Sequence, residues 1–359
     1  MGAVENADIV VMGVGTIGDP LIDLLTSNME MLGINSVVFS KKSPRKEDRP
    51  TVQALTRQGA SFAVPANMMD EFSHAGMTPK MNLEEALAKA AVIIDCTNVG
   101  SQNKATLYPK SAPNVIGILA QGSATNFGDP FAYCISKVKV GQKWVWIVSC
   151  NTHAVSATLR SIAFDGFKIG FDNLLFGDFM IFRRANDISQ VSRFIPSPEA
   201  GMHDDPIFGS HQAADAAALF KYAYGVDLPL FSSVAKANSQ YMHLTRFTLT
   251  LKEEDLTREE VIRRLAADPL IALTKKNSSG LVYSFARSKG HNGRLLNQLV
   301  VCEDTIMVHQ NRVVGFSLTP QDGNSLLSST AATLALIDPK GWEEKMGQLI
   351  VPPFAFSEV

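Results

Sequence analysis

A glycine-rich turn near the start of the chain limits the choice of fold most strongly. The apolar run 9–12 predicts a buried strand, and Leu21, Leu24 and Leu25 follow the turn at helical spacing. Between them the sequence reads GVGTIG, a pattern typical of dinucleotide-binding turns in this strand–turn–helix context. Phosphate would lie at the helix N-terminus. We therefore predict nucleotide contacts from Gly13, Gly15, Thr16, Ile17 and Gly18.

Strands and helices alternate along the first part of the chain. Further apolar runs predict strands at 36–39, 92–96, 115–119 and 144–148, and Asn82 is placed to cap a helix between two of them. This alternation predicts an α/β fold with a doubly wound parallel sheet, in which ligands bind at the carboxyl ends of the strands. Turn residues that follow these strand ends are predicted to contact the cofactor: Thr97, Gly100, Gln121 and Gly122.

The end of the second predicted strand favours NADP over NAD. An NAD site usually has an acidic residue there, which binds the ribose 2′-hydroxyl. Here the strand ends in Ser40, Lys41 and Lys42, whose hydroxyl and cations suit a 2′-phosphate. NAD remains possible, because a solvated basic loop would have the same composition.

Cys150 lies where a predicted strand gives way to a helix. The run 144–148 breaks at Ser149, and Val155, Leu159 and Ile162 then recur at helical spacing. We expect Asn151 or Thr152 to cap this helix. A helix N-terminus stabilises a thiolate, so the sulfur could act as a nucleophile with its oxyanion held by backbone N–H groups. The alternative is a buried structural cysteine.

The second half of the chain has a different pattern. Segments 177–182, 244–251 and 306–308 resemble strands, partly alternating, and Thr257 begins a capping box. We predict an α+β domain with a mostly antiparallel sheet, and long loops over 185–235. The expected domains are 1–149 for the dinucleotide, 150–324 for catalysis, and 325–359 as a C-terminal helix and tail returning to the first domain.

Composition excludes several classes of protein. The chain has 359 residues and a formal net charge of −2, so nothing points to nucleic acid or a membrane surface. The four cysteines lack CxxC spacing, which argues against a zinc site or a disulfide framework and favours a reducing cytoplasm. His203, Asp204, Asp205 and His211 could be imagined around a metal, but a surface loop explains them more simply, and we predict no metal.

Several motifs together resemble a known family, the archaeal (type II) glyceraldehyde-3-phosphate dehydrogenases. The resemblance runs nearly end to end. It is carried by 13–18, Ser40-Lys41, Asp95-Cys-Thr97, Asn103-Lys104, Gln121-Gly122, Ser149-Cys-Asn-Thr152, Arg183-Arg-Ala185, Ser210-His211 with Asp215, and Met242-His243. It implies a Rossmann-type domain, a catalytic domain and a homotetramer.

The resemblance also implies roles for individual residues. Cys150 matches the family's nucleophile and His243 its base, so a thiohemiacetal and then a thioester would form on the sulfur. Arg183 and Arg184 match a basic pair that grips phosphate, and because strand neighbours point to opposite faces we expect only one to touch substrate. The remaining predicted substrate contacts are Ser149, Asn151, Thr152, His153 and His211.

Departures from the family pattern leave the substrate open. His153 replaces a small hydroxyl residue, Gln212 replaces a second histidine, and Thr245 replaces the second histidine of the Met-His motif. Our first hypothesis is an NADP-dependent enzyme that interconverts glyceraldehyde 3-phosphate and 1,3-bisphosphoglycerate. The second is a reductase of an acyl-CoA such as malonyl-CoA or succinyl-CoA. The third is a non-catalytic, nucleotide-binding regulatory protein.

Overall fold

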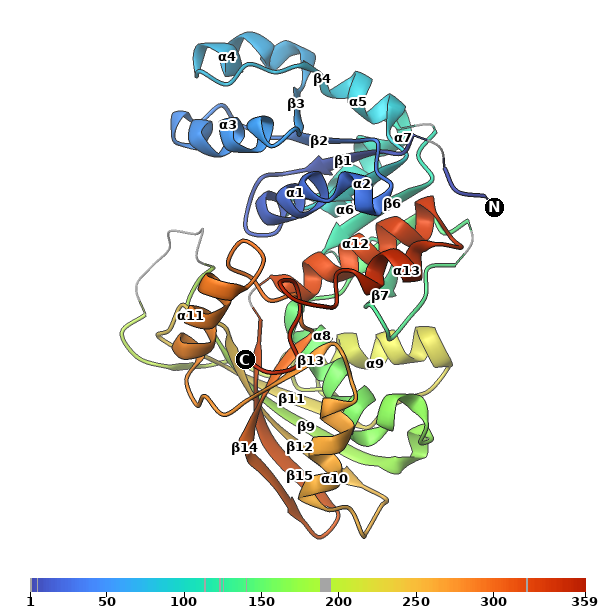
Figure 1. Cartoon of the computed structure of the whole chain (residues 1–359), viewed down its shortest axis with the longest axis vertical. Coiled ribbons are helices and arrows are strands. Elements are labelled where there is room, and N and C mark those ends of the chain that lie inside the picture. Colours follow the sequence, from blue (N-terminus) through green and yellow to red (C-terminus); the bar gives the residue numbers. More distant parts are fainter. Residues whose placement is uncertain are drawn as a thin grey trace. The chain divides into compact units, whose positions relative to one another are not determined.

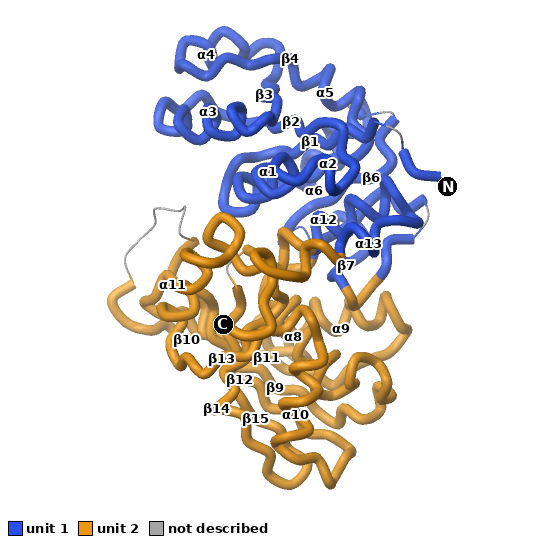
Figure 2. Tube along the Cα trace, viewed as in Figure 1, with its two compact units in different colours: residues 1–133, 137–147, 328–346 blue, residues 134–136, 148–327, 347–359 orange. Residues whose placement is uncertain are grey.

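The protein folds into two compact units (Figure 2). The computed structural model describes residues 2–4, 6–112, 114–122, 124, 126–139, 141–187, 195–320 and 322–359. Unit 1 comprises 1–133, 137–147 and 328–346, and unit 2 comprises 134–136, 148–327 and 347–359. Residues 328–346 thus belong to the first unit, whereas the final segment 347–359 belongs to the second.

Unit 1 is built on a parallel sheet of eight strands in the order β4-β3-β2-β1-β5-β6-β8-β7 (Figure 1). The strands are β1 (Asp8–Met12), β2 (Ser36–Ser40), β3 (Ser61–Val64), β4 (Met81–Asn82), β5 (Val92–Asp95), β6 (Gly117–Gln121), β7 (Asp129–Phe131) and β8 (Trp144–Ile147). The predicted doubly wound α/β fold is confirmed. The strand order reverses between β1 and β5, and such a switch point is where dinucleotides bind in these sheets.

Helices connect strands β1 to β6: α1 (Gly18–Ser27), α2 (Met29–Leu32), α3 (Arg49–Arg57), α4 (Met69–His74), α5 (Leu83–Lys89), α6 (Gly100–Thr106) and α7 (Tyr108–Ser111). The later part of α12 (Gly323–Ile337) and most of α13 (Trp342–Gly347), which come near the end of the chain, also belong to unit 1. Asn82 caps α5 as predicted, because its side chain accepts a hydrogen bond from the Glu85 N–H at 2.7 Å. Fully buried side chains such as Ile9, Ile93 and Ile118 fill the sheet faces, and each contributes roughly 1.5–3 kcal/mol.

Unit 2 is built on a seven-stranded sheet in the order β10-β11-β9-β12-β15-β14-β13. The strands are β9 (Leu174–Arg183), β10 (Glu199–Ala200), β11 (Leu230–Lys236), β12 (His243–Leu251), β13 (Ile271–Thr274), β14 (Leu299–His309) and β15 (Arg312–Thr319). Only β9–β11 and β13–β14 pair in parallel, so the predicted mostly antiparallel sheet is confirmed. Alternation places Phe179 and Phe247 on one face, where both are fully buried.

The helices of unit 2 include α8 (Cys150–Thr158), α9 (His211–Tyr224), α10 (Arg258–Ala266) and α11 (Ser279–Lys289). A π-helical turn, Leu159–Ala163, extends α8. The predicted cap of α10 is present, because the Thr257 hydroxyl accepts from the Glu260 N–H at 3.2 Å. Among the helices that the structure describes, none combines the length and the hydrophobicity that a membrane span requires.

The prediction of long loops over 185–235 was wrong for much of that segment. Residues His211–Tyr224 form α9 and Leu230–Lys236 form β11, while 188–194 lie outside the described residues. The helix has a physical basis in its run of alanines, which are the strongest helix formers, and in Gly225, which ends it in the left-handed conformation at φ +72°.

Candidate active site

The glycine turn of unit 1 has the geometry that a dinucleotide requires. Gly13 adopts φ +94°, and its N–H donates to the Ser40 carbonyl at 2.9 Å. A Cβ on Gly18 would lie 2.0 Å from the Gly13 carbonyl oxygen, so only glycine fits there. Nothing lies within 4 Å of the corresponding position on Gly15, which leaves its backbone open to a phosphate. Thr16 and Ile17 complete the turn, and α1 begins at Gly18.

A buried carboxylate organises the neighbouring loop after β5. Asp95 is fully buried and accepts from the Thr97 N–H at 2.9 Å, the Thr97 hydroxyl at 2.6 Å and the Asn103 amide at 2.9 Å. The Thr97 hydroxyl is therefore bound to Asp95, and its methyl group lies 3.1 Å from the position of a Cβ on Gly13. Thr97 shapes the glycine turn through packing. Gly100 begins α6 close to Ala120.

Gln121 has an unused acceptor at the end of β6. Its Nε2 donates to the Ser329 hydroxyl at 2.8 Å, whereas its Oε1 is buried and has no hydrogen-bond partner within the described residues. Leaving a buried acceptor unpaired costs about 1–3 kcal/mol, which a donor on a bound ligand would remove. Gly122, at φ +58°, ties β6 to β8 because its N–H donates to the Ile147 carbonyl at 3.0 Å. These features fit a bound dinucleotide.

The basic residues after β2 are only partly free. Lys41 Nζ lies 2.8 Å from Asp48 Oδ2, so a carboxylate already compensates its charge. Lys42 is exposed and the Ser40 side chain is buried. A 2′-phosphate would have to compete with Asp48 for Lys41, and the preference for NADP stays a prediction.

In unit 2, Cys150 is the first residue of α8. The helix is capped by Ser149, whose hydroxyl accepts from the Thr152 N–H at 3.3 Å, and not by Asn151 or Thr152 as predicted. The reason is the backbone of Ser149, which is extended at φ −65° and ψ 158° and so precedes the first helical residue. The Asn324 amide donates to the Cys150 carbonyl at 2.9 Å.

Opposing charges surround the Cys150 sulfur. Burial raises the pKa of the thiol above its ordinary value, and the nearby Asp322 and Asp187 carboxylates raise it further. The Arg184 and Arg183 guanidinium groups lower the pKa. The net direction is upward, so the helix N-terminus alone does not make this cysteine a resting thiolate.

His243 lies at the start of β12 with its ring almost completely buried. Its Nδ1 accepts a hydrogen bond from the Arg184 backbone N–H at 3.1 Å. Burial, Arg184 and Arg183 hold the pKa of this imidazole well below its usual range. A neutral ring whose Nδ1 accepts must carry its proton on Nε2, so the hydrogen bond assigns the tautomer. In this arrangement His243 offers an N–H donor and not a proton acceptor.

Arg184 follows β9 and its guanidinium is held by two carboxylates. Nε donates to Asp187 Oδ1 at 2.9 Å, and Nη2 contacts Asp187 and lies 3.6 Å from Asp322 Oδ1. Nη1 is buried and has no partner within the described residues. Arg183, at the end of β9, is exposed. Arg184 therefore presents a desolvated donor, which is the stronger way to bind an anion.

Other residues predicted to contact substrate are used inside the protein. His153 is 1% exposed, its Nδ1 lies 2.9 Å from the Ser149 carbonyl oxygen, and burial lowers its pKa to about 4. Asn151 and Thr152 are also buried, with Asn151 Oδ1 accepting from the Thr319 hydroxyl at 3.4 Å. These residues build the start of α8.

His211 is the remaining residue that was predicted to contact substrate. His211 is the first residue of α9 and is exposed, and both burial of its ring and the nearby Arg183 lower its pKa. Of His153, His211 and His243, only His211 is exposed. Within the described residues, no group of three histidine, cysteine or acidic side chains could hold a metal ion.

Sequence reasoning missed several residues of this cluster. Asp187, Arg294 and Asn324 belong to no motif that points to a role, and Asp322 matches only faintly an acidic stretch near the family's C-terminus. These residues come from loops and helix starts that are mostly far apart in the chain. Asp322 adopts φ +64°, an uncommon conformation for a residue other than glycine, but dihedral angles are not visible in a sequence. The signal that could have indicated them is charge, since two arginines beside a cysteine need counter-ions.

Comparison with known proteins finds several relatives that share the same name. No family model matches the chain. The glyceraldehyde-3-phosphate dehydrogenase of Metallosphaera sedula is 28% identical over 314 residues, covering 85% of each chain. The enzyme of the same name from Methanopyrus kandleri is 25% identical over 350 residues, covering 93% of each. That of Hyperthermus butylicus is 26% identical over 323 residues, covering 87% of this chain and 86% of its own.

Proposed function

Because the chain belongs to the archaeal-type glyceraldehyde-3-phosphate dehydrogenase family, we propose that it interconverts glyceraldehyde 3-phosphate and 1,3-bisphosphoglycerate through a thioester on Cys150. It is an oxidoreductase that uses a nicotinamide nucleotide and acts on aldehyde groups. The observation that carries the proposal is the association of Cys150, the Nε2–H of His243 and the unpaired Nη1 of Arg184 within one unit.

The chemistry follows from these three groups. When the Cys150 thiol loses its proton to solvent, Arg184 and Arg183 stabilise the resulting thiolate, which attacks the aldehyde carbon. The Nε2–H of His243 donates to the oxygen on which negative charge develops, and such a donor contributes about 10²–10³ in rate. A bound nicotinamide nucleotide would supply the hydride acceptor. Phosphate then attacks the Cys150 thioester, and Arg184 offers Nη1 to an anionic group.

Cys150 follows the last strand of the parallel sheet closely in the chain. Only Val148 and Ser149 separate the end of β8 from Cys150. Ligands of such sheets bind at the carboxyl ends of the strands. Residues proposed to hold the dinucleotide are the glycine turn, Gln121 and Gly122, with Ser40, Lys41 and Lys42 reading a 2′-phosphate of NADP.

A cationic segment favours a second candidate, an acyl-CoA reductase. Between Asp268 and Glu303 the chain has five cationic residues and no acidic one: Lys275, Lys276, Arg287, Lys289 and Arg294. Of these, only Arg294 is near a carboxylate within the described residues. The ring of Tyr241, which precedes His243 by two residues, stacks on the ring of Tyr283, with centroids 4.6 Å apart. Phosphates and an adenine ring, as in CoA, would suit cations beside an aromatic pair.

One assay separates the candidates. NADPH oxidation is measured with a panel of acyl phosphates and acyl-CoA thioesters. We expect turnover with 1,3-bisphosphoglycerate, and turnover with malonyl-CoA or succinyl-CoA alone would replace the first proposal by the second. No turnover with any member would indicate a non-catalytic, nucleotide-binding protein.

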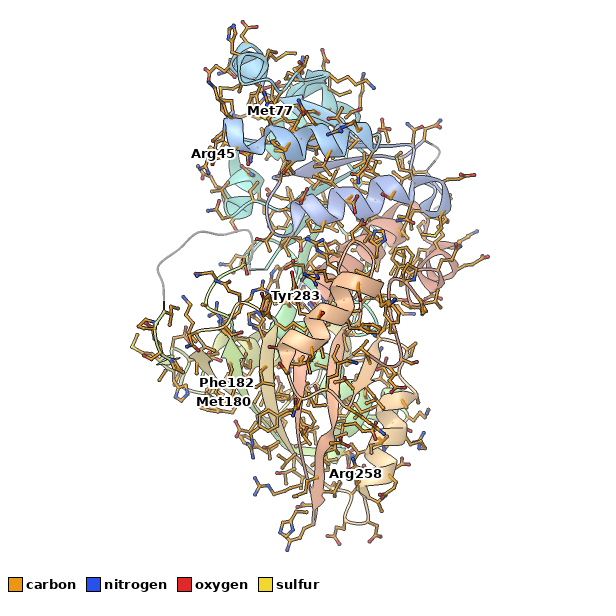
Figure 3. All side chains as sticks on the ribbon, turned by 60° about the vertical axis from the view of Figure 1, so that its left-hand side comes forward. Arg45, Met77, Met180, Phe182, Arg258 and Tyr283 are labelled. Atoms are coloured by element: carbon orange, nitrogen blue, oxygen red, sulfur yellow. The ribbon has the colours of Figure 1, made fainter. Side chains whose placement is uncertain are left out.

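The sheet of unit 2 supports self-association, and we propose a homotetramer. The face opposite to the one that carries Phe179 and Phe247 includes Met180 and Phe182, which are only half-buried (both are labelled in Figure 3). Leu244 and Phe316, on neighbouring strands of the same face, are also half-buried, and both pack against the apolar cluster that includes Val282 and Ala286 of α11. A second copy of the chain would cover the part of this face around Met180 and Phe182, which Arg246 borders.

A further inference from the structure

Asp322 links two cations beside Cys150. Its Oδ1 lies 3.6 Å from Arg184 Nη2, and its Oδ2 lies 4.0 Å from Arg294 Nε. The residue is 6% exposed, so the carboxylate is largely removed from water. Burying a charge is costly unless it is paired. Here the Asp322 carboxylate is paired with the guanidinium groups of Arg184 and Arg294.

The start of α12 fixes Asp322 in position. A Cβ on the next residue, Gly323, would lie 1.6 Å from the Leu295 carbonyl oxygen, so the backbone of α12 and the 295 segment are in direct contact. Asn324, one residue further, donates to the carbonyls of Cys150 at 2.9 Å and Gln298 at 3.2 Å. The start of α12 therefore contacts Cys150, the first residue of α8, through Asn324. Through Asp322, the residue before α12, it contacts Arg184 and Arg294.

Electrostatics connects Asp322 to the sulfur. The Asp322 carboxylate raises the pKa of the Cys150 thiol, and so does Asp187, whereas Arg184 and Arg183 lower it. Burial raises the pKa of Asp322 itself to about 6, against the opposing effect of Arg184 and Arg294. The charged groups that act on the Cys150 thiol are thus Arg183 at the end of β9, Arg184 after it, and the carboxylates of Asp187 and Asp322.

We propose that Asp322 is a positioning residue that, with Asp187, holds the Arg184 guanidinium so that Nη1 stays free for an anionic group, and that its charge limits the reactivity of the Cys150 sulfur. Asp187 is three residues from Arg184 and its side chain is 31% exposed, so it provides a local contact. Asp322 provides a second contact to Arg184, which is buried and comes from a distant part of the chain. That the anionic group belongs to the substrate rests on the proposed function, whereas the effect on the sulfur does not.

The test compares Asp322→Asn with Asp172→Asn. Asp172 is an exposed residue of the same unit whose carboxylate lies 3.0 Å from Lys252, so its replacement removes the same charge away from the cluster. Alkylation of Cys150 by iodoacetamide is followed from pH 5.5 to 9 by peptide mass spectrometry, which separates it from the exposed Cys134. Steady-state kinetics with the acyl phosphate give KM and kcat.

In Asp322→Asn we expect alkylation of Cys150 at pH 7 to rise at least about threefold and its pH profile to move to lower pH. We expect KM for the acyl phosphate to rise about tenfold, with a smaller change in kcat, because Arg184 loses one of its two supports. Asp172→Asn should change neither. A profile and a KM identical to those of the wild type would overturn the proposal.

A second variant covers the case in which Asp322→Asn does not fold. Asp187→Asn removes the half-exposed support of the same arginine and should move the alkylation profile in the same direction. An unchanged profile in Asp187→Asn would then overturn the proposal. Alkylation needs no turnover, so a wild-type protein that does not convert the acyl phosphate would refute the proposed substrate while the alkylation result still decides the role of Asp322.

Discussion

At the scale of single residues, hydrogen bonding decides what His243 can do. The resemblance to the family implies that His243, in the Met-His motif, acts as a base. The Arg184 N–H occupies its Nδ1 at 3.1 Å, and its pKa is held well below the usual range, so it stays neutral across the physiological pH range. A fixed neutral donor suits stabilisation of an oxyanion better than proton abstraction.

If His243 acts as a neutral hydrogen-bond donor, two substitutions of it should have different effects. A glutamine places an amide N–H near the position of Nε2–H, whereas alanine removes the donor. We expect His243→Ala to lower kcat by about 10²–10³, and His243→Gln to recover at least about tenfold of that loss. Equal loss in both variants would indicate that His243 works as a base. Steady-state kinetics on both proteins, with circular dichroism to verify folding, makes the comparison.

At the scale of elements, α8 owes the position of Cys150 to its cap. The Ser149 hydroxyl bonds the Thr152 N–H, and the same residue's carbonyl contacts the ring of His153. Sequence analysis placed the strand, the break and the helix correctly, since their apolar periodicities are local. It put the cap two or three residues too late, at Asn151 or Thr152 instead of Ser149, because serine, asparagine and threonine all cap well and only backbone geometry distinguishes them.

Removing the cap should affect both stability and chemistry. We expect Ser149→Ala to lower the free energy of unfolding by about 1 kcal/mol and to reduce kcat as well, since Cys150 is the next residue. The matched control is Thr257→Ala, which removes the cap of α10 and should cost a similar free energy with no change in kcat. Urea unfolding and steady-state kinetics of both variants test this. An unchanged kcat in Ser149→Ala would show that the helix cap does not affect the chemistry at Cys150.

The loop after β2 is the element that should select the cofactor. Replacing Lys41 and Lys42 together by alanine should raise KM for NADP about tenfold more than KM for NAD, because only NADP carries the 2′-phosphate. The ion pair between Lys41 and Asp48 makes Lys42 the freer of the two. Kinetics with both cofactors on the double variant measures the ratio. A parallel rise for the two cofactors would mean that these lysines do not read the 2′-phosphate.

At the scale of the whole molecule, the two sheets could be predicted and the charge cluster could not. Apolar runs at regular spacing indicated the parallel sheet, and partial alternation indicated the antiparallel one. Arg184, Asp322 and Arg294 come together only when β9, α12 and the segment after α11 pack in three dimensions. Their contacts depend on tertiary structure, which local sequence patterns do not encode.

Assembly is also a property of the whole molecule. We expect the protein to be a tetramer and Phe182→Glu to shift it to smaller species, because a charge on this half-buried apolar face opposes burial against a second copy. Leu175→Glu, at an exposed position earlier in β9, is the control and should leave the assembly intact. Light scattering after size-exclusion chromatography gives the masses. A wild-type monomer, or an unaffected Phe182→Glu variant, would exclude this face as an interface.

The most direct measurement is the intact mass of the protein during a single turnover without phosphate. The wild-type protein is mixed with NADP and glyceraldehyde 3-phosphate, quenched in acid, and digested to locate any acyl group. We expect one acyl group per chain on Cys150, released when phosphate is added, and none in Cys150→Ser. Turnover without an acyl group on Cys150, or equal turnover in Cys150→Ser, would contradict this expectation.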